Sequence, residues 1–194
     1  MKKPDLSSVK VIILVEGLTE QILLPYFASV CGLDLAAMAA MIIPAGGAKK
    51  LLRKYLYWKE RTKLPIFCLF DRDAQVWAAK VSSQLRVGDY LHVLADGEIE
   101  DLVQLEFFVH QLNNYLTDDL LNDENRPVVI SDFLPAQKRT LSLDRIWRQR
   151  QLGKFEKVKF AQFITNALCN QESISADAKY MFDKLSTAVR LAAG

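Results

Sequence analysis

The chain has 194 residues, of which 51% are hydrophobic and 25% are charged. This length and composition suit one folded domain with a proper hydrophobic core and room for an appendage, and they exclude an intrinsically disordered chain. The formal net charge of +2 is too small to indicate nucleic-acid or membrane binding by itself. Any basic surface must therefore be local.

The sequence contains no targeting or membrane-spanning signal. The apolar run Val11–Val15 is interrupted by Glu16, which makes it too short for a signal-peptide core, and residues 35–43 are half the length of a membrane span. The three cysteines lie far apart and form no CxxC pair, which argues against a disulfide framework or a zinc knuckle. We therefore expect a soluble, cytoplasmic protein.

The first half of the chain alternates strand and helix signals. Apolar and β-branched runs predict strands at Val11–Val15, Met41–Ile43, Pro65–Phe70 and Tyr90–Leu94. Apolar stripes with helical spacing predict helices at Thr19–Val30, Ala48–Lys63 and Ala74–Leu85. Such alternation predicts an α/β fold with a parallel four-stranded sheet flanked by helices.

The pattern changes after about residue 112. A polar, acidic stretch and the short apolar piece Val128–Ile130 lead into mostly helical patterning, and Val158–Leu191 has the pattern of two helices separated near Ser173. We therefore expect residues 1–112 to form the sheet-containing domain and residues 113–194 to form a helical extension.

Carboxylates follow three of the four predicted strands. Glu16 follows the first strand, with Glu20 one turn into the next helix, Asp71 and Asp73 follow the third, and Glu100 follows the fourth. Because the carboxyl ends of parallel strands meet at one edge of a sheet, we expect these side chains to converge. Clustered carboxylates repel one another and raise one another's pKa. A divalent cation would resolve that conflict.

The residue types around these carboxylates indicate the kind of ion. Oxygen ligands without a nearby His or Cys favour Mg²⁺ or Mn²⁺ over zinc. Gly17 is expected to let the backbone turn sharply beside Glu16. Asp71 and Asp73 fall on the same side if strand geometry continues through Asp73. In the alternative interpretation, Glu20 only charges a helix N-terminus and the aspartates belong to an ordinary polar loop.

These motifs resemble a known family. The sequences VEGLTEQILLP, FDRDA and GEIEDL, which follow the first, third and fourth strands, are similar to the Toprim domain of the OLD (overcoming lysogenization defect) nucleases. The similarity covers roughly residues 9–110 and, more weakly, KVKFA in the tail. It implies a Rossmann-like Toprim catalytic domain over residues 1–112 and a helical extension over residues 113–194. It also implies an endonuclease that cleaves DNA with two Mg²⁺ or Mn²⁺ ions, in anti-phage defence or DNA processing.

The resemblance also implies roles for individual acids. By their matching positions, Glu16 and Asp71 would hold one ion with help from Asp73, and Glu20 and Glu100 would hold or bridge to a second. A pair of ions can clamp the attacking and leaving oxygens of a phosphodiester, so no nucleophilic side chain is needed.

One lysine completes the implied catalytic set of Glu16, Asp71 and Lys157. Lys157 best matches the family lysine that stabilises charge on the transferred phosphate, with Lys154 and Lys159 as neighbouring alternatives. Glu98 stands where such nucleases often carry a small hydroxyl residue. This departure keeps open a second interpretation, a non-catalytic Toprim module that binds an ATPase or nucleic acid.

Two basic segments are candidate nucleic-acid-binding surfaces. Residues 138–159 contain eight basic and two acidic side chains with aromatic residues interleaved, and a second cluster follows Gly46-Gly47 at a predicted helix N-terminus. A solvated helix face is the alternative interpretation of the first segment. The candidate contacts are Lys49, Lys50, Arg145, Arg148, Arg150, Lys154 and Lys159.

No nucleoside triphosphate site is readable in the chain. The segment PAGGAKK lacks the spacing of a P-loop. Because OLD-like nucleases generally pair the Toprim half with an ATPase half, the resemblance implies either a separately encoded nuclease subunit or an isolated domain. The expected partners are DNA and an ATPase on a separate chain or missing domain, with no membrane, and an oligomer is compatible with this interpretation.

Overall fold

The computed structural model describes residues 6–95, 97–116, 127–134, 137–168 and 174–193. Within these ranges, four strands form one fully parallel sheet in the order β2-β1-β3-β4. The strands are β1 (Val11–Val15), β2 (Ala40–Pro44), β3 (Ile66–Phe70) and β4 (Tyr90–Val93). The predicted α/β fold with a parallel four-stranded sheet is confirmed.

The two central strands are apolar along their whole length. Every residue of β1 and β3 is buried. Strands covered by helices on both faces need such continuous apolar runs, whereas a half-exposed strand would alternate with polar residues. In the register of the sheet, Ile13 pairs with Ile42 on one side and with Phe67 on the other. The carboxyl ends of β1 and β3 therefore lie next to each other.

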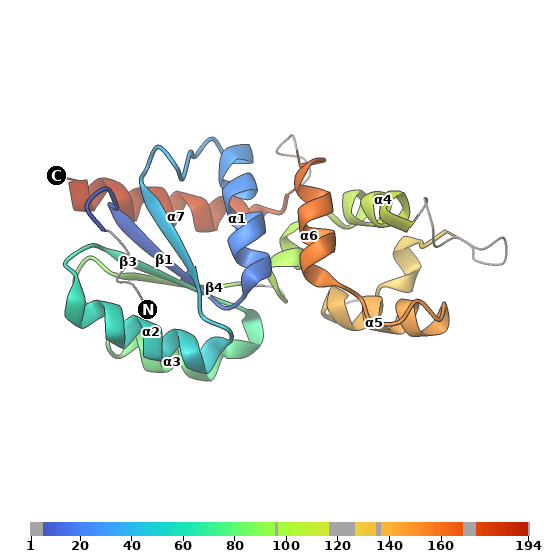
Figure 1. Ribbon diagram of the computed structural model, residues 1–194, viewed down its shortest axis with the longest axis horizontal. Coiled ribbons are helices and arrows are strands. Elements are labelled where there is room, and N and C mark those ends of the chain that lie inside the picture. Colours follow the sequence, from blue (N-terminus) through green and yellow to red (C-terminus); the bar gives the residue numbers. More distant parts are fainter. Residues whose placement is uncertain (1–5, 96, 117–126, 135–136, 169–173, 194) are drawn as a thin grey trace.

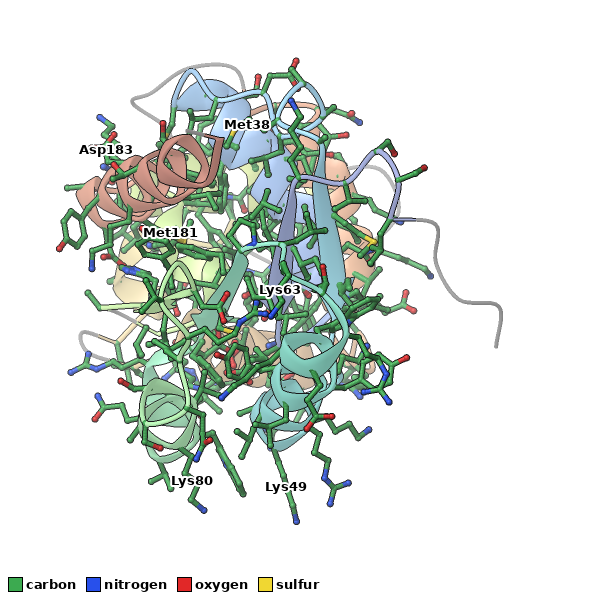
Figure 2. All side chains as sticks on the ribbon, turned by 90° about the vertical axis from the view of Figure 1, so that its left-hand side faces the viewer. Met38, Lys49, Lys63, Lys80, Met181 and Asp183 are labelled. Carbon is green, nitrogen blue, oxygen red and sulfur yellow. The ribbon has the colours of Figure 1, made fainter. Side chains whose placement is uncertain are left out.

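Helices cover both faces of the sheet (Figure 1). Helices α1 (Leu18–Val30) and α7 (Ala176–Ala193) lie on one face, and α2 (Ala48–Arg61) and α3 (Gln75–Ser82) lie on the other. Figure 2 shows Met181 of α7 turned toward the sheet and Asp183 turned away from it. Met181 is accordingly buried and Asp183 exposed. An amphipathic helix packs in this way because burial of its apolar stripe stabilises the fold.

Three further helices lie together beyond the carboxyl ends of the strands (Figure 1). They are α4 (Leu105–Leu116), α5 (Arg139–Gln149) and α6 (Lys157–Thr165). Phe160 of α6 packs edge to face on Phe108 and Tyr115 of α4, with ring centroids 5.3 and 5.4 Å apart. Helix α6 also packs against α1. These contacts hold the start of α6 close to the carboxyl edge of the sheet.

The second half of the chain follows the predicted helical pattern. The two predicted C-terminal helices are confirmed as α6 and α7, while Ser173 lies outside the described residues. Val128 is buried ahead of the 3-10 turn η3 (Ile130–Asp132). One continuous core contains residues on both sides of position 112, from Ile13 to Phe182. The division of the chain at residue 112 stays a prediction.

A buried ionic cluster fixes the opposite end of the sheet. Asp89, whose side chain is 1% exposed, accepts hydrogen bonds from Arg86 Nε at 2.8 Å and from the Tyr55 hydroxyl at 2.9 Å. It also accepts the backbone N–H of Ile66, the first residue of β3, at 2.9 Å. This cluster links α2, β3 and the turn before β4.

None of the described helices is long and apolar enough to cross a membrane.

Candidate active site

A cleft of about 250 Å³ lies at the carboxyl edge of the sheet. It lies where β1 and β3 end, between the loop before α2, the 3-10 turn η2 (Ile99–Leu102) and the start of α6. Five carboxylates and one ammonium group face it. The lining residues are Glu16, Gly17, Thr19, Glu20, Gly46, Gly47, Asp71, Glu98, Glu100 and Lys157.

Glu16 is held in place by the backbone of two neighbouring segments. Its carbonyl oxygen accepts the N–H groups of Gly46 and Gly47 at 2.7 and 2.8 Å. Its side-chain Oε1 accepts the N–H of Asp71 at 3.0 Å. Gly46 and Gly47 both have positive φ angles, of 82° and 114°, which L residues with a side chain rarely adopt. The first predicted acid is therefore fixed at the junction of β1, β2 and β3.

The chain bends at Glu16 and Gly17, as predicted, but the bend does not require glycine. The Gly17 φ of −138° and ψ of −172° are extended values that any residue can adopt. A Cβ atom at this position would lie 3.1 Å from Glu20 Oε2. The same oxygen accepts the Gly17 N–H at 3.1 Å. Glycine thus leaves room for the carboxylate of Glu20, which both caps α1 and lines the cleft.

Asp71 and Asp73 differ in what their side chains contact. Strand β3 ends at Phe70 and the 3-10 turn η1 (Arg72–Ala74) follows, so strand geometry does not continue through Asp73. Asp71 lines the cleft. The Asp73 side chain is 64% exposed, lies outside the lining, and accepts a hydrogen bond from Lys138 Nζ at 2.6 Å. A role for Asp73 as a metal ligand stays a prediction.

A tight turn after β4 presents the last two acids. Gly97 has a φ of 63°, and a Cβ atom there would lie 1.7 Å from Asp101 Oδ2, so no other residue fits without rearrangement. Asp101 Oδ2 accepts the N–H of Glu98 at 2.7 Å and closes the turn. As a result, Glu98 and Glu100 both face the cleft.

The cleft holds more negative charge than its own cations balance. Burial, together with the carboxylates of Glu20, Glu16, Glu98 and Glu100, raises the pKa of Asp71 to about 9. Burial raises the pKa of Glu100 to about 7, and the pKa values of Glu16 and Glu20 are also raised, mainly by burial. Glu100 Oε1 is buried and has no hydrogen-bond partner among the described residues.

Of the three candidate lysines, Lys157 alone lines the cleft. Its Nζ lies 2.7 Å from Glu98 Oε2 and 3.9 Å from Glu100 Oε1. Burial lowers the pKa of Lys157, but the neighbouring carboxylates outweigh burial and raise the pKa overall. Lys154 is exposed, and Lys159 is exposed and pairs with a glutamate of its own helix turn. Of these three lysines, the structure therefore brings Lys157 to the acids.

Sequence analysis missed two side chains that contact the cleft carboxylates. Lys138 Nζ lies 3.2 Å from Glu98 Oε1, and the Thr140 hydroxyl donates to Glu98 Oε2 at 2.9 Å. Lys138 was recognised only as one member of the basic segment. A usable signal exists in its position directly before α5, where the positive end of the helix dipole disfavours a cation unless a carboxylate is near.

The candidate nucleic-acid contacts come from different helices, as the two predicted basic segments require. Arg145 donates to the Asp132 carbonyl of η3, and Arg148 is exposed and donates to a carbonyl of its own helix at 3.2 Å. Arg150 is half-buried. Lys49 and Lys50 lie in the first turn of α2, which begins at Ala48 after the glycines of the cleft, and Figure 2 shows Lys49 extending away from the sheet. Nucleic-acid binding by these side chains stays a prediction.

The donor atoms of the cleft suit a hard divalent cation. No His or Cys is among its lining residues, and oxygen ligands favour Mg²⁺ or Mn²⁺. Throughout the described ranges, no three His, Cys, Asp or Glu side chains already form a metal cage. The raised pKa of Asp71 and the unpartnered oxygen of Glu100 nevertheless fit such an ion, because a cation would relieve both.

Part of the sequence matches a family model. Residues 9–73 match the model described as overcoming lysogenization defect protein-like, TOPRIM domain. The chain carries an OLD-like Toprim domain. Toprim domains generally bind divalent metals and act in nucleic-acid cleavage. The matched part of this Toprim chain includes Glu16, Glu20, Asp71 and Asp73, and it ends before the other acids of the cleft.

The C-terminal regions of two solved OLD proteins share the fold of most of this chain. The C-terminal region of the Burkholderia pseudomallei OLD protein is 16% identical, with a TM-score of 0.69, over 93% of this chain and 98% of that chain. The C-terminal region of the Xanthomonas campestris pv. campestris OLD protein is 18% identical, with a TM-score of 0.66, over 96% and 98%. At such identities the likeness shows the fold alone. Among curated protein sequences, none matches the OLD-like Toprim chain.

Proposed function

We propose that this OLD-like Toprim chain is a divalent-metal-dependent endonuclease that hydrolyses phosphodiester bonds in DNA. One observation carries the proposal: carboxylates that are far apart in the chain meet in one cleft together with the ammonium group of Lys157. Such a cleft favours cations and, once they are bound, a phosphate.

The acids of the cleft divide into two groups. Glu16 and Asp71, joined by a backbone hydrogen bond, would hold one ion, and Glu20 and Glu100 would hold or bridge to a second. Bound Mg²⁺ or Mn²⁺ supplies Lewis acidity and a water of lowered pKa. Asp73 would join the first group only after leaving Lys138.

Lys157 provides the positive charge that the chemistry requires. Its side chain is 40% exposed and lines the cleft. There it would face the transferred phosphate and offset the negative charge that develops in the transition state. Among the described residues that line the cleft there is no serine, cysteine or tyrosine, and the one hydroxyl side chain, Thr19, is buried. Water is therefore the nucleophile that we propose.

The lysines that we propose to bind DNA lie next to the cleft in the sequence. Lys49 and Lys50 follow the cleft glycines, and we propose that they contact the phosphates of a DNA strand. An ATPase partner, self-association and a role in anti-phage defence or DNA processing are proposals from family analogy.

Plasmid cleavage tests the function. The protein is expected to nick or cut plasmid DNA with Mg²⁺ or Mn²⁺ and to stop when EDTA is added. Glu16→Gln and Asp71→Asn should each lower the rate more than about 100-fold, since even the outer partners of metal ligands cost about 10- to 100-fold. Glu60→Gln is the matched control, because that side chain is 76% exposed on α2.

Two results would contradict the proposal. Full cleavage by both cleft variants would place the activity elsewhere. Binding of Mn²⁺ by calorimetry without cleavage of duplex DNA, single-stranded DNA or RNA would favour a non-catalytic module. Cleavage of RNA alone would change the substrate and leave the assignment of the cleft intact.

A further inference from the structure

The carboxylate of Glu98 contacts side chains from two helices of the extension. Its Oε1 lies 3.2 Å from Lys138 Nζ. Its Oε2 accepts hydrogen bonds from Lys157 Nζ at 2.7 Å and from the Thr140 hydroxyl at 2.9 Å. The side chain is only 15% exposed. Both oxygens of this carboxylate are therefore already engaged by donors of the same chain.

The two lysines that contact Glu98 both stand at helix N-termini. Lys138 directly precedes α5 and Lys157 is the first residue of α6. Neither helix has an acid in its first turn. Because the N-terminal end of a helix carries partial positive charge, a cation there needs an anion from outside the helix. Glu98 is the anion that the two helices share.

Glu100 differs from Glu98, although both come from the same turn. Glu100 Oε1 has no hydrogen-bond partner among the described residues, and its distance of 3.9 Å from Lys157 Nζ is too long for a hydrogen bond. Glu100 Oε1 therefore has no hydrogen bond to lose to a cation, whereas both oxygens of Glu98 already accept hydrogen bonds. Glu100 is therefore suited to bind a cation, and Glu98 is suited to hold the side chains that contact it.

We propose that Glu98 is a positioning residue, which fixes the ammonium group of Lys157 at the cleft and does not itself hold an ion. Lys138 and Thr140 orient the Glu98 carboxylate, and Glu98 in turn orients Lys157. The consequence for catalysis rests on the proposed function. The contact itself does not, because it forms between side chains of the chain alone.

A fixed ammonium group matters because Lys157 has a long, flexible side chain. An untethered lysine samples many rotamers and meets the transferred phosphate in only some of them. One short charge-assisted hydrogen bond to a buried carboxylate removes most of this freedom before substrate arrives. Displacement of a catalytic group by about 1 Å can cost about 100-fold in rate.

The first test observes the Lys157 ammonium group in protein kept free of divalent ions. In a ¹H–¹⁵N spectrum, an ammonium group held by a carboxylate exchanges slowly with water and gives a resolved signal, which Lys157→Gln identifies by its loss. Glu98→Gln should remove that signal by exchange broadening, and Glu98→Asp should restore it in part. Glu156→Gln, which removes the acid that pairs with Lys159, should leave it unchanged.

The second test follows cleavage. Glu98→Gln should lower kcat by about 10- to 100-fold with little change in KM, because the contact acts on the transition state and not on DNA binding. Glu98→Asp should recover part of kcat. The affinity for Mn²⁺, measured by calorimetry, should stay within about threefold of wild type, whereas loss of a ligand would cost more.

Each outcome decides the proposal. An unchanged Lys157 signal in Glu98→Gln, or loss of Mn²⁺ binding in that variant, would overturn it. If Glu98→Gln does not fold, Thr140→Val removes one donor to the same oxygen without altering any charge, and the same loss of signal is expected. If the wild-type protein cleaves nothing, the proposed nuclease function fails while the spectrum still tests the positioning of Lys157.

Discussion

The backbone N–H of Asp71 donates a 3.0 Å hydrogen bond to the side chain of Glu16. This bond joins the ends of two neighbouring strands, β1 and β3, and keeps two acids together despite their repulsion. Both carboxylates have raised pKa values, in each case chiefly because of burial. Burying these two carboxylates in their charged form therefore costs free energy of folding, and bound cations would offset that cost.

That cost predicts an unusual dependence of stability on pH. The pKa of the Asp71 carboxyl group is raised from 3.8 to about 9 in the folded protein, so folding favours its protonated form. The stability that this preference contributes is complete below about pH 4 and is lost as the pH rises through about 9. In chelator, the free energy of unfolding should fall over this range, measured by urea denaturation. Asp71→Asn should flatten the fall and be more stable than wild type at pH 9 by roughly a few kcal/mol. A variant less stable than wild type at that pH would contradict this account.

Divalent ions should reverse the loss of stability. A ligand that binds only the folded state at 100 times its Kd stabilises by about 2.7 kcal/mol. For a chain of this size the melting temperature should rise by about 5 to 10 °C, measured by differential scanning calorimetry with Mn²⁺. Glu16→Gln should abolish most of the rise, and Glu60→Gln, on the exposed surface of α2, should keep it. An equal rise in all three proteins would indicate ion binding outside the cleft.

The two lysines of α6 provide a matched pair. Lys157 contacts the cleft carboxylates, whereas Lys159, two residues later, pairs with an exposed glutamate. Lys157→Met should lower the rate of DNA cleavage by about 100- to 1,000-fold, the usual cost of a lost group that stabilises transition-state charge. Lys159→Met should lower it far less, because Lys159 contacts none of the cleft carboxylates and its substitution would remove only one of several predicted DNA contacts. Equal losses in a plasmid assay would refute the assignment.

The buried cluster at the far end of the sheet should matter for stability alone. Arg86→Leu leaves Asp89 buried without its main partner and should cost about 3 to 5 kcal/mol of unfolding free energy in urea. Arg61→Leu is the control, because its pair with Glu60 is exposed and contributes less than about 1 kcal/mol. In both variants the rate of cleavage per folded molecule should match that of the wild type, because neither arginine side chain lines the cleft.

The sequence by itself determined the fold class and most of the cleft. Four apolar runs separated by helical stripes indicated a parallel sheet, and the rule that such strands end at one edge brought Glu16, Asp71 and Glu100 together. These inferences succeed because strand patterning and the chemistry of strand ends are local in sequence. Asp73 shows their limit, since a 3-10 turn that begins directly after Asp71 ended the alternation of side chains.

Only the tertiary structure decided which basic groups meet the acids. Glu98 contacts Lys138 and Lys157, which lie 40 and 59 positions away along the chain. The KVKFA motif singled out Lys157 by resemblance, and Lys138 stands directly before α5, but neither pattern says which carboxylate these lysines contact. Their positions depend on how α5 and α6 pack beside the sheet, and packing among distant apolar side chains is a property of the whole core that short-range periodicity does not encode.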